Sequence, residues 1–298
     1  QSVEQRGLLL TFVISMQGWA MLLSGVVALI ALQLSCSLEA LWRLLLAFGA
    51  LPSLVAFGLR WQLRESAEFN RARAQATGAR QPGRILAELW PVLVCTSMSW
   101  FLMNISLYSL GTFKGQVLHE QLQRGNKDNL SAREEIFATA RFSAITSIFA
   151  ILGFAVAGAL INRLGRFRIQ LGGFAALAVL FFVQGGISAP SSRPPLWVVV
   201  TLLGLVFFFQ NFGPNTTTYI IPAEVFPTAV RATCHGISAA SGKVGALLGT
   251  GSFPMFEESC GMRAVYFTCA CTAVVGVMVT ACLMSVNIKN MQAIYRSI

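Results

Sequence analysis

Charged residues, and carboxylates above all, are scarce in this sequence. Only 11% of its 298 residues are charged, and Asp128 is the only aspartate among 12 acidic residues. A soluble domain usually carries about twice that share of charge. Hydrophobic residues make up 55% of the chain, and they gather into separate runs of roughly 20, about the length of a helix that spans a bilayer. The composition therefore predicts an integral membrane protein.

The motifs of common enzyme and metal-protein classes are also missing. No Walker motif is present, so ATP hydrolysis is not expected. The two histidines, His119 and His235, lie in or beside expected loops without an acid or nucleophile constellation. No two of the cysteines have the CxxC spacing of zinc and redox sites; they are Cys36, Cys95, Cys234, Cys260, Cys269, Cys271 and Cys282. We expect no enzyme, no metal site and no cofactor.

The long apolar runs predict an all-α bundle of about eight transmembrane helices. Lipid satisfies no backbone hydrogen bonds, so each run must be helical or belong to a closed barrel. Barrel strands are short and alternate in polarity, whereas these runs are continuously apolar. The expected helices span 7–33, 41–61, 90–113, 137–161, 169–188, 196–222, 235–256 and 263–286.

The basic residues predict the orientation of the chain in the membrane. A net charge of +10 could suggest nucleic acid, but we find no stacking platform or groove-reading motif, and we expect no such partner. The connections 62–89, 162–168 and 223–234 carry arginine and alternate to one side. The positive-inside rule makes that side cytoplasmic. An even number of helices then places both termini in the cytoplasm, and we expect the plasma membrane.

Lys243 lies inside the expected helix 235–256, whose glycines suit close helix packing. At 1.5 Å per residue it is about 10 Å or more from either end. A lysine at that depth is costly unless it pairs or faces water, and no carboxylate of this chain lies at its level. Either an anionic ligand or a partner outside the chain would balance it. The alternative is a side chain that snorkels to the interface.

A second polar segment, 210–218, reads QNFGPNTTT. Its amides and hydroxyls surround a Gly-Pro pair that interrupts the backbone ladder. Transporters build midplane binding sites from broken helices with such polar groups. Hydrogen bonding between helices would explain the same residues without a ligand, and we expect it for about half of them.

A resemblance to a known family is carried by FGPNTTTYIIPAEVFPT and by RATCHGISAASGKVGA after it. These segments resemble the phosphate:proton symporter family of the major facilitator superfamily, the plant and fungal high-affinity phosphate transporters. RGLLLTFVISMQGWAMLLSG, WRLLLAFGALPS and SWFLMNISLYS are similar to that family's fifth, sixth and seventh helices. The resemblance spans nearly the whole chain and implies that the first four of twelve helices are absent. Residues 1–61 would then end an N-terminal half, 62–89 form an Arg-rich cytoplasmic linker, and 90–298 form the C-terminal half.

The resemblance implies a secondary transporter that moves inorganic phosphate by alternating access, driven by protons and without a cofactor. The phosphate-site residues of the family correspond here to Gln17, Trp100, Tyr108, Asn215 and Lys243. Their chemistry fits, because lysine supplies charge while amide, indole and phenol groups replace the hydration of phosphate.

Two positions depart from the family pattern. Asn104 stands where the family usually has aspartate, four residues before the tyrosine, and an amide cannot take a proton. Asn162 stands where the family favours aspartate, before the gating motif that Arg163, Gly165 and Arg166 form. The first change puts proton coupling in question, and the second is expected to weaken a cytoplasmic gating contact.

Two other functions remain open. A related carrier of glycerophosphodiesters or other organic anions would keep the fold and also use a midplane cation. A phosphate sensor that does not transport would explain Asn104 and the absent helices. Competition of phosphate uptake by those anions, and binding without uptake, would separate these alternatives.

Overall fold

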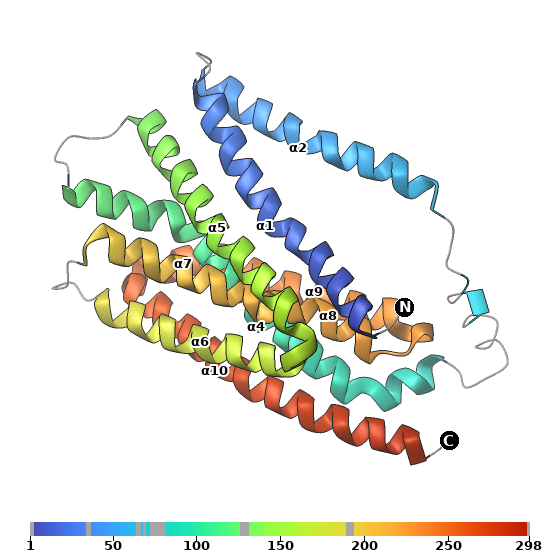
Figure 1. Ribbon diagram of the computed structural model, residues 1–298. Helices are drawn as coiled ribbons and strands as arrows, with labels where there is room; N and C mark the ends of the chain where they lie inside the picture. Colours follow the sequence, from blue (N-terminus) through green and yellow to red (C-terminus); the bar gives the residue numbers. More distant parts are fainter. Residues whose placement is uncertain are drawn as a thin grey trace.

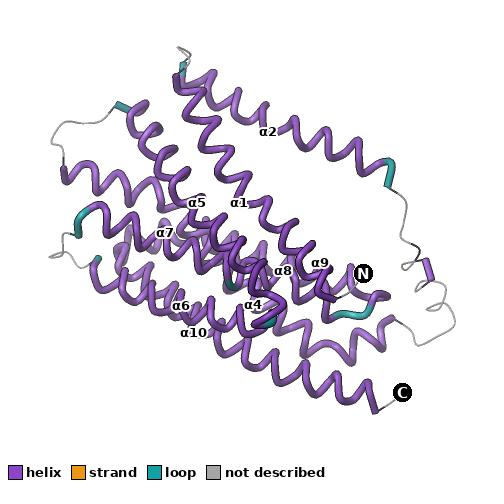
Figure 2. Tube along the Cα trace, in the orientation of Figure 1, coloured by secondary structure: helices purple, strands orange, loops and turns teal. Residues whose placement is uncertain are grey.

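The protein is a bundle of α-helices in the computed structural model, which describes residues 3–33, 37–63, 67, 70–71, 82–125, 131–188 and 194–296. These ranges contain no strand (Figures 1 and 2). In chain order the helices are α1 (Val3–Gln33), α2 (Leu38–Trp61), α4 (Pro82–Gly125), α5 (Ala132–Leu164), α6 (Arg166–Ile187), α7 (Leu196–Phe212), α8 (Pro214–Val225), α9 (Thr228–Gly251) and α10 (Phe253–Arg296).

Seven segments of the described chain are long and apolar enough to cross a membrane. The helices α7 and α8 together form one of them, Leu196–Val225, and α9 is not among the seven. This helix carries Arg231, His235 and Lys243, which lower its hydropathy, yet its 24 residues pack along α4. All eight expected helices therefore exist, and the prediction of an all-α membrane bundle is confirmed.

Most helix ends differ from those expected; α10, for example, begins at Phe253 rather than at 263. Two places bear on the site: Gly213, where the sequence already indicated an interruption, and the start of α9. The run 196–222 is divided at Gly213, whose backbone angles of φ −99° and ψ −109° leave the helix before Pro214 starts α8. The helix α9 begins at Thr228 rather than at 235, so His235 lies inside a helix and not in or beside a loop. The start of α9 was missed because an apolar run shows only the part of a helix that lipid can cover. Residues 228–234 mix polar and apolar side chains and still belong to the helix. Lys243 consequently lies nearer the C-terminal end of its helix than the sequence predicted.

Most of the helices pack against one another, while α2 diverges from the bundle (Figure 1). The main core joins α4, α5, α6, α7 and α10 around large buried side chains such as Met103, Phe174 and Phe207. Near its start, α2 contributes Leu41 to a small cluster with Ala31 and Leu32 of α1. Beyond that cluster the apolar side chains of α2 are exposed, as suits a surface that lipid covers.

The helices α4 and α9 lie unusually close because glycines of α9 face α4. A Cβ atom added to Gly245 would lie 2.2 Å from the Phe101 carbonyl oxygen, and one added to Gly249 would lie 2.7 Å from that of Ile105. Neither gap accepts a side chain, so the prediction that these glycines serve helix packing is confirmed. The consequence is that α4, which bears Trp100 and Tyr108, has a fixed position against α9.

Candidate functional site

Among the described side chains of α4, the phenol of Tyr108 is the hydrogen-bond partner of Lys243 on α9. The Lys243 Nζ atom lies 3.5 Å from Tyr108 Oη and 5.7 Å from the centroid of the tyrosine ring. The first distance marks a weak hydrogen bond, so the ammonium group keeps donors for another partner. Lys243 is exposed and Tyr108 is partly buried. No carboxylate of the described residues forms an ion pair with Lys243.

Asn215, the second residue of α8, links that helix to α1. Its Nδ2 atom donates to Gln17 Oε1 at 3.0 Å and to Asn211 Oδ1 at 2.7 Å. The break at Gly213 makes this contact possible, because it starts a new helix whose first turn faces α1. Gly173 of α6 packs directly on the break, since a Cβ atom there would lie 2.5 Å from the Gly213 Cα atom.

Most other polar side chains around the break bond within their own segment. Thr216, Thr217 and Thr218 are buried, and each hydroxyl donates to a carbonyl oxygen four or five residues earlier. Gln210 reaches another helix, because its Nε2 atom lies 3.2 Å from the Met103 carbonyl oxygen and 3.2 Å from Ser106 Oγ of α4. Fewer of these residues bridge helices than the sequence predicted, because nearby carbonyls satisfy the hydroxyls first.

Three rings from three helices meet edge to face beside these contacts. The ring centroids of Trp100 on α4 and Tyr219 on α8 are 6.4 Å apart. His235 on α9 lies 5.4 Å from the Trp100 ring and 5.3 Å from the Tyr219 ring. All three side chains are partly buried. Tyr219 follows Asn215 by one helical turn, so the ring group connects the α8 break with α4 and α9.

Asn104 is buried at 4% exposure and joins α4 to α9. Its Nδ2 atom donates to the Gly242 carbonyl oxygen at 2.8 Å, one residue before Lys243. An ionised carboxylate offers no hydrogen to donate and could not make this bond. Asparagine at this position therefore fixes the backbone that carries the lysine.

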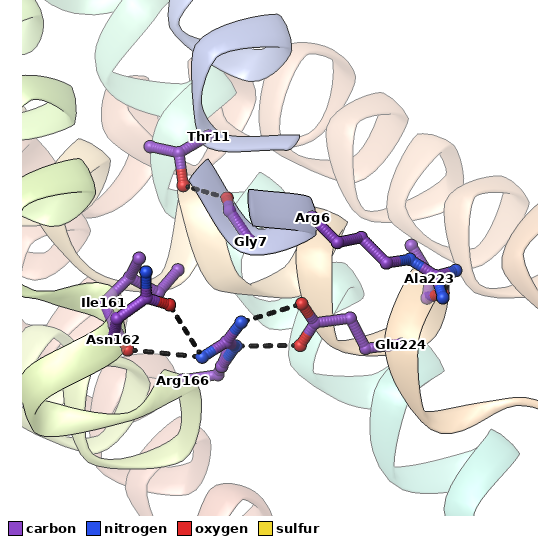
Figure 3. Close-up of polar contacts among 8 residues, drawn as sticks. All are labelled: Arg6, Gly7, Thr11, Ile161, Asn162, Arg166, Ala223 and Glu224. Carbon is purple, nitrogen blue, oxygen red and sulfur yellow. Dashed lines mark hydrogen bonds and ion pairs between the residues drawn. The ribbon is translucent and has the colours of Figure 1, made fainter. Parts of the chain in front are cut away.

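A second polar cluster lies at one end of the bundle and contains the predicted gating motif (Figure 3). Arg166 donates from Nε to Glu224 Oε2 at 2.8 Å and from Nη2 to Glu224 Oε1 at 2.9 Å. Arg6 of α1 donates to the Ala223 carbonyl oxygen of α8 at 2.6 Å. Gly7 of α1 leaves room for the Arg166 side chain, because a Cβ atom on Gly7 would lie 2.3 Å from Arg166 Nη2.

The other residues of the gating motif lie where α5 turns into α6. Gly165 has φ +86°, a conformation that glycine adopts without strain, and it is the single residue between the two helices. Asn162 accepts a hydrogen bond from Arg166 Nη1 at 3.2 Å, while Arg163 is exposed. The amide of Asn162 thus keeps the contact but adds no charge to it. Whether the contact is weaker than an aspartate would make it stays a prediction.

Comparison with known proteins shows the family to which this sequence belongs. The sequence model of the sugar (and other) transporter family matches residues 128–292, more than half of the chain. The chain belongs to the sugar (and other) transporter family. Members of this family are transporters rather than enzymes, in agreement with the absence of enzyme motifs from the sequence.

Inorganic phosphate transporters of plants are among the relatives of this chain. It is 29% identical to inorganic phosphate transporter 1-2 of Oryza sativa subsp. japonica, over 94% of this chain and 65% of that protein. It is 32% identical to inorganic phosphate transporter 1-6 of the same plant, over 86% of this chain and 57% of that protein. With inorganic phosphate transporter 1-1 of Arabidopsis thaliana it shares 30% identity, over 86% and 59%. The chain therefore spans between 57% and 65% of the length of these relatives, and the resemblance to phosphate transporters is confirmed.

A solved structure confirms the fold of this chain. The major facilitator superfamily proton:xylose symporter XylE, bound to 6-bromo-6-deoxy-D-glucose, matches with a TM-score of 0.74. The match covers 93% of this chain and 64% of the XylE chain at 16% sequence identity. At that identity the likeness establishes the shared helix bundle and leaves the cargo open.

The structure joins the predicted site residues in two pairs, Tyr108 with Lys243 and Gln17 with Asn215. Trp100 adjoins both α8 and α9 through its ring. Sequence reasoning missed three residues that take part: Tyr219, Glu224 and His235. Glu224 is the only carboxylate between residues 136 and 256, and that isolation was the available signal of a charge partner. The signal for His235 was its spacing of eight residues, about two helical turns, from Lys243.

Proposed function

We propose that this protein is a secondary active transporter that moves inorganic phosphate across a membrane by alternating access. The observation that carries the proposal is Lys243, an exposed cation inside a packed membrane helix whose polar neighbour is a phenol at 3.5 Å. A cation without a carboxylate partner suits an anionic cargo. The relatives named as inorganic phosphate transporters support phosphate as that anion.

The proposed site binds phosphate through one charge and several neutral donors. Lys243 supplies the positive charge, and the Tyr108 hydroxyl lies beside it. The indole N–H of Trp100 and the amide of Gln17 are further donors on α4 and α1. The Gln17 oxygen already accepts from Asn215, which leaves the amide hydrogens of Gln17 for the ligand. Phosphate oxygens accept such bonds in place of water.

Alternating access requires two parts of the molecule that separate and close. We propose that 1–61 belongs to one half and 90–298 to the other, joined by the linker 62–89. Among the hydrogen bonds that then cross between the halves are those of Gln17 with Asn215 and of Arg6 with the Ala223 carbonyl oxygen. Both would break and reform during transport.

The orientation is part of the same proposal. The N and C marks lie at one end of the bundle in Figure 1. The basic connections of the sequence assign this end to the cytoplasm. A plasma-membrane location would give the proton gradient that phosphate uptake needs.

The test is phosphate uptake by the full-length protein in proteoliposomes, comparing native protein with Lys243→Gln. A charge-assisted hydrogen bond is worth about 1.5–3 kcal/mol, so binding should weaken roughly 10- to 100-fold. Lys243→Arg is the matched control because it retains the charge, and it should keep part of the uptake. Normal uptake by Lys243→Gln, with the protein correctly inserted, would refute the proposal.

Two further outcomes of this assay identify the alternatives. Stronger competition by glycerophosphodiesters than by phosphate would make the cargo an organic phosphate. Phosphate binding without any uptake would make the protein a sensor.

A further inference from the structure

We propose that His235 is the protonatable residue of this site, taking up one proton when phosphate binds and releasing it when phosphate leaves. The inference rests on the proposed phosphate transport. It assigns the coupling of proton binding to phosphate binding to a histidine of α9. The step is a simple proton transfer: neutral imidazole gains a proton to become imidazolium, and loses it again without any other bond changing.

Geometry places His235 among the proposed phosphate-binding groups. Its ring lies 5.4 Å from Trp100 and 5.3 Å from Tyr219, so it touches both α4 and α8. It is partly buried, and no hydrogen bond to its ring nitrogens occurs within the described part of the chain. Trp100 also approaches α9 beside Lys243, since a Cβ atom on Gly242 would lie 2.5 Å from Trp100 Cδ1. The indole thus contacts both the segment of Lys243 and the ring of His235.

The charged groups near His235 already have partners. On α8, Glu224 accepts two hydrogen bonds from Arg166 of α6. On α9 itself, Arg231 donates from Nε to the Phe226 carbonyl oxygen at 3.0 Å. On α1, Arg6 donates to a carbonyl oxygen of α8.

The groups of α4 that face α9 do not ionise near neutral pH. They include the Trp100 indole, the Asn104 amide, which donates to Gly242, and the Thr96 hydroxyl, which lies 2.9 Å from Ser238 Oγ. Lys243, two turns further along α9, has the Tyr108 phenol as its neighbour. None of the described carboxylates contacts the imidazole. Histidine is the side chain that ordinarily changes charge between about pH 5 and 8, so His235 is the group here that can respond to pH.

Protonation of His235 and phosphate binding should favour each other. The rise per residue places His235 and Lys243 about 12 Å apart along α9, so a second positive charge adds to the attraction for an anion. Without an anion the two cations repel, which favours the neutral imidazole. Linkage then requires that phosphate increase the proton affinity by the same factor by which the proton increases phosphate affinity.

The experiment measures phosphate affinity and proton uptake of the full-length protein between about pH 5.5 and 7.5. We expect native affinity to fall roughly tenfold over this range, with a proton taken up on binding. His235→Phe keeps a ring against Trp100 and Tyr219 but cannot ionise, and His235→Asn keeps a polar group of smaller size. Phosphate itself changes its protonation across this range, so both variants should keep only the pH dependence and proton exchange that phosphate contributes, and should lose the rest. His119→Asn is the control, because His119 is the only other histidine in the chain.

Three outcomes would overturn the inference. A native pH profile and native proton uptake in both His235 variants would show that another group carries the proton. Loss of phosphate binding at every pH, in correctly inserted variants, would show a purely structural role. Absence of phosphate binding by the native protein would refute the proposed function, and this inference with it, whereas the first two outcomes leave the proposed function standing.

Discussion

The two polar regions of this protein differ in how their charges are balanced. At the end of the bundle, Arg166 and Glu224 form two hydrogen bonds, and each side chain is 16% exposed. Inside the bundle, Lys243 is exposed, and its hydrogen-bond partner among the described residues is the Tyr108 phenol at 3.5 Å. A charge pair satisfied on both sides holds helices together and leaves nothing for a ligand. A cation beside neutral donors has the opposite property, because its charge remains available.

The hydrogen bonds between helices show the same contrast. At the end of the bundle, charged side chains from α1 and α6 bond to the last turn of α8, and one from α9 bonds to Phe226 directly after it. Between α4 and α9, neutral contacts such as Asn104 with Gly242 hold the helices at close range. Removing a charge from the end region should therefore reduce stability. Adding a charge to the inner region should instead change phosphate binding.

The largest effect on stability is expected from Glu224→Gln. The change leaves Arg166 unpaired in a region that is mostly shielded from water, and such losses cost about 3–5 kcal/mol when burial is complete. Because the pair keeps some exposure, we expect about 2 kcal/mol, or a fall of roughly 4–8 °C in the thermal midpoint. Circular dichroism of the purified protein in detergent would measure it.

Glu39→Gln provides the matched control for that measurement. Glu39 pairs with Arg43 on α2, but these side chains are 63% and 66% exposed, and water replaces such a pair at little cost. Its midpoint should not change measurably. Equal midpoints for the two variants would show that the Arg166–Glu224 pair does not stabilise the fold.

A smaller effect is expected from Asn104→Asp, and it concerns pH. An ionised aspartate cannot donate to the Gly242 carbonyl oxygen, and its charge repels a phosphate bound at Lys243. Affinity should fall roughly tenfold near pH 7.5 and recover as the pH falls, because the protonated acid can donate again. Phosphate binding at several pH values checks the expectation, and uptake with an imposed pH gradient gives the proton-to-phosphate ratio.

The corresponding Asn-to-Asp substitution at the end of the bundle shows whether the pH effect depends on the position of the carboxylate. Asn162→Asp places a carboxylate beside Arg166, where a positive charge is already present. It should strengthen that contact and leave the pH dependence of phosphate binding unchanged. If the two aspartate variants respond alike to pH, or if Asn104→Asp matches native protein in proton-to-phosphate ratio, Asn104 has no bearing on coupling.

The sequence predicted the helices well because the membrane imposes a simple rule on length and polarity. It also located the break at Gly213, since Gly-Pro interrupts the backbone ladder regardless of tertiary context. The start of α9 was wrong by seven residues, and this error hid His235. Helices continue beyond the apolar segment that lipid covers, and hydropathy does not register that extension.

Contacts between distant segments were the harder part of the site. Arg166 and Glu224 are 58 residues apart in the chain, and no local periodicity links them. The resemblance to phosphate transporters supplied Gln17 and Asn215, and their hydrogen bond across 198 residues follows from packing of α1 on α8. Sequence chemistry identified which groups could bind an anion. Their pairing depended on tertiary structure.

The smallest functional effect is expected from a covalent test of the inner packing. Cys95 of α4 and Cys282 of α10 have Sγ atoms 3.9 Å apart, and small rotations would bring them to the bonding distance of about 2.05 Å. Copper phenanthroline should therefore join them, and mass spectrometry of the digested protein should find the linked peptides. Cys95→Ser should abolish the product, while Cys234→Ser, a cysteine in the same apolar cluster, should not.

Because α4 and α10 already pack together, the bond should alter phosphate affinity less than about threefold, within the range of a modest allosteric coupling. A large loss of affinity would mean that α4 moves against α10 during binding. Absence of the linked peptides would contradict the packing of α4 on α10.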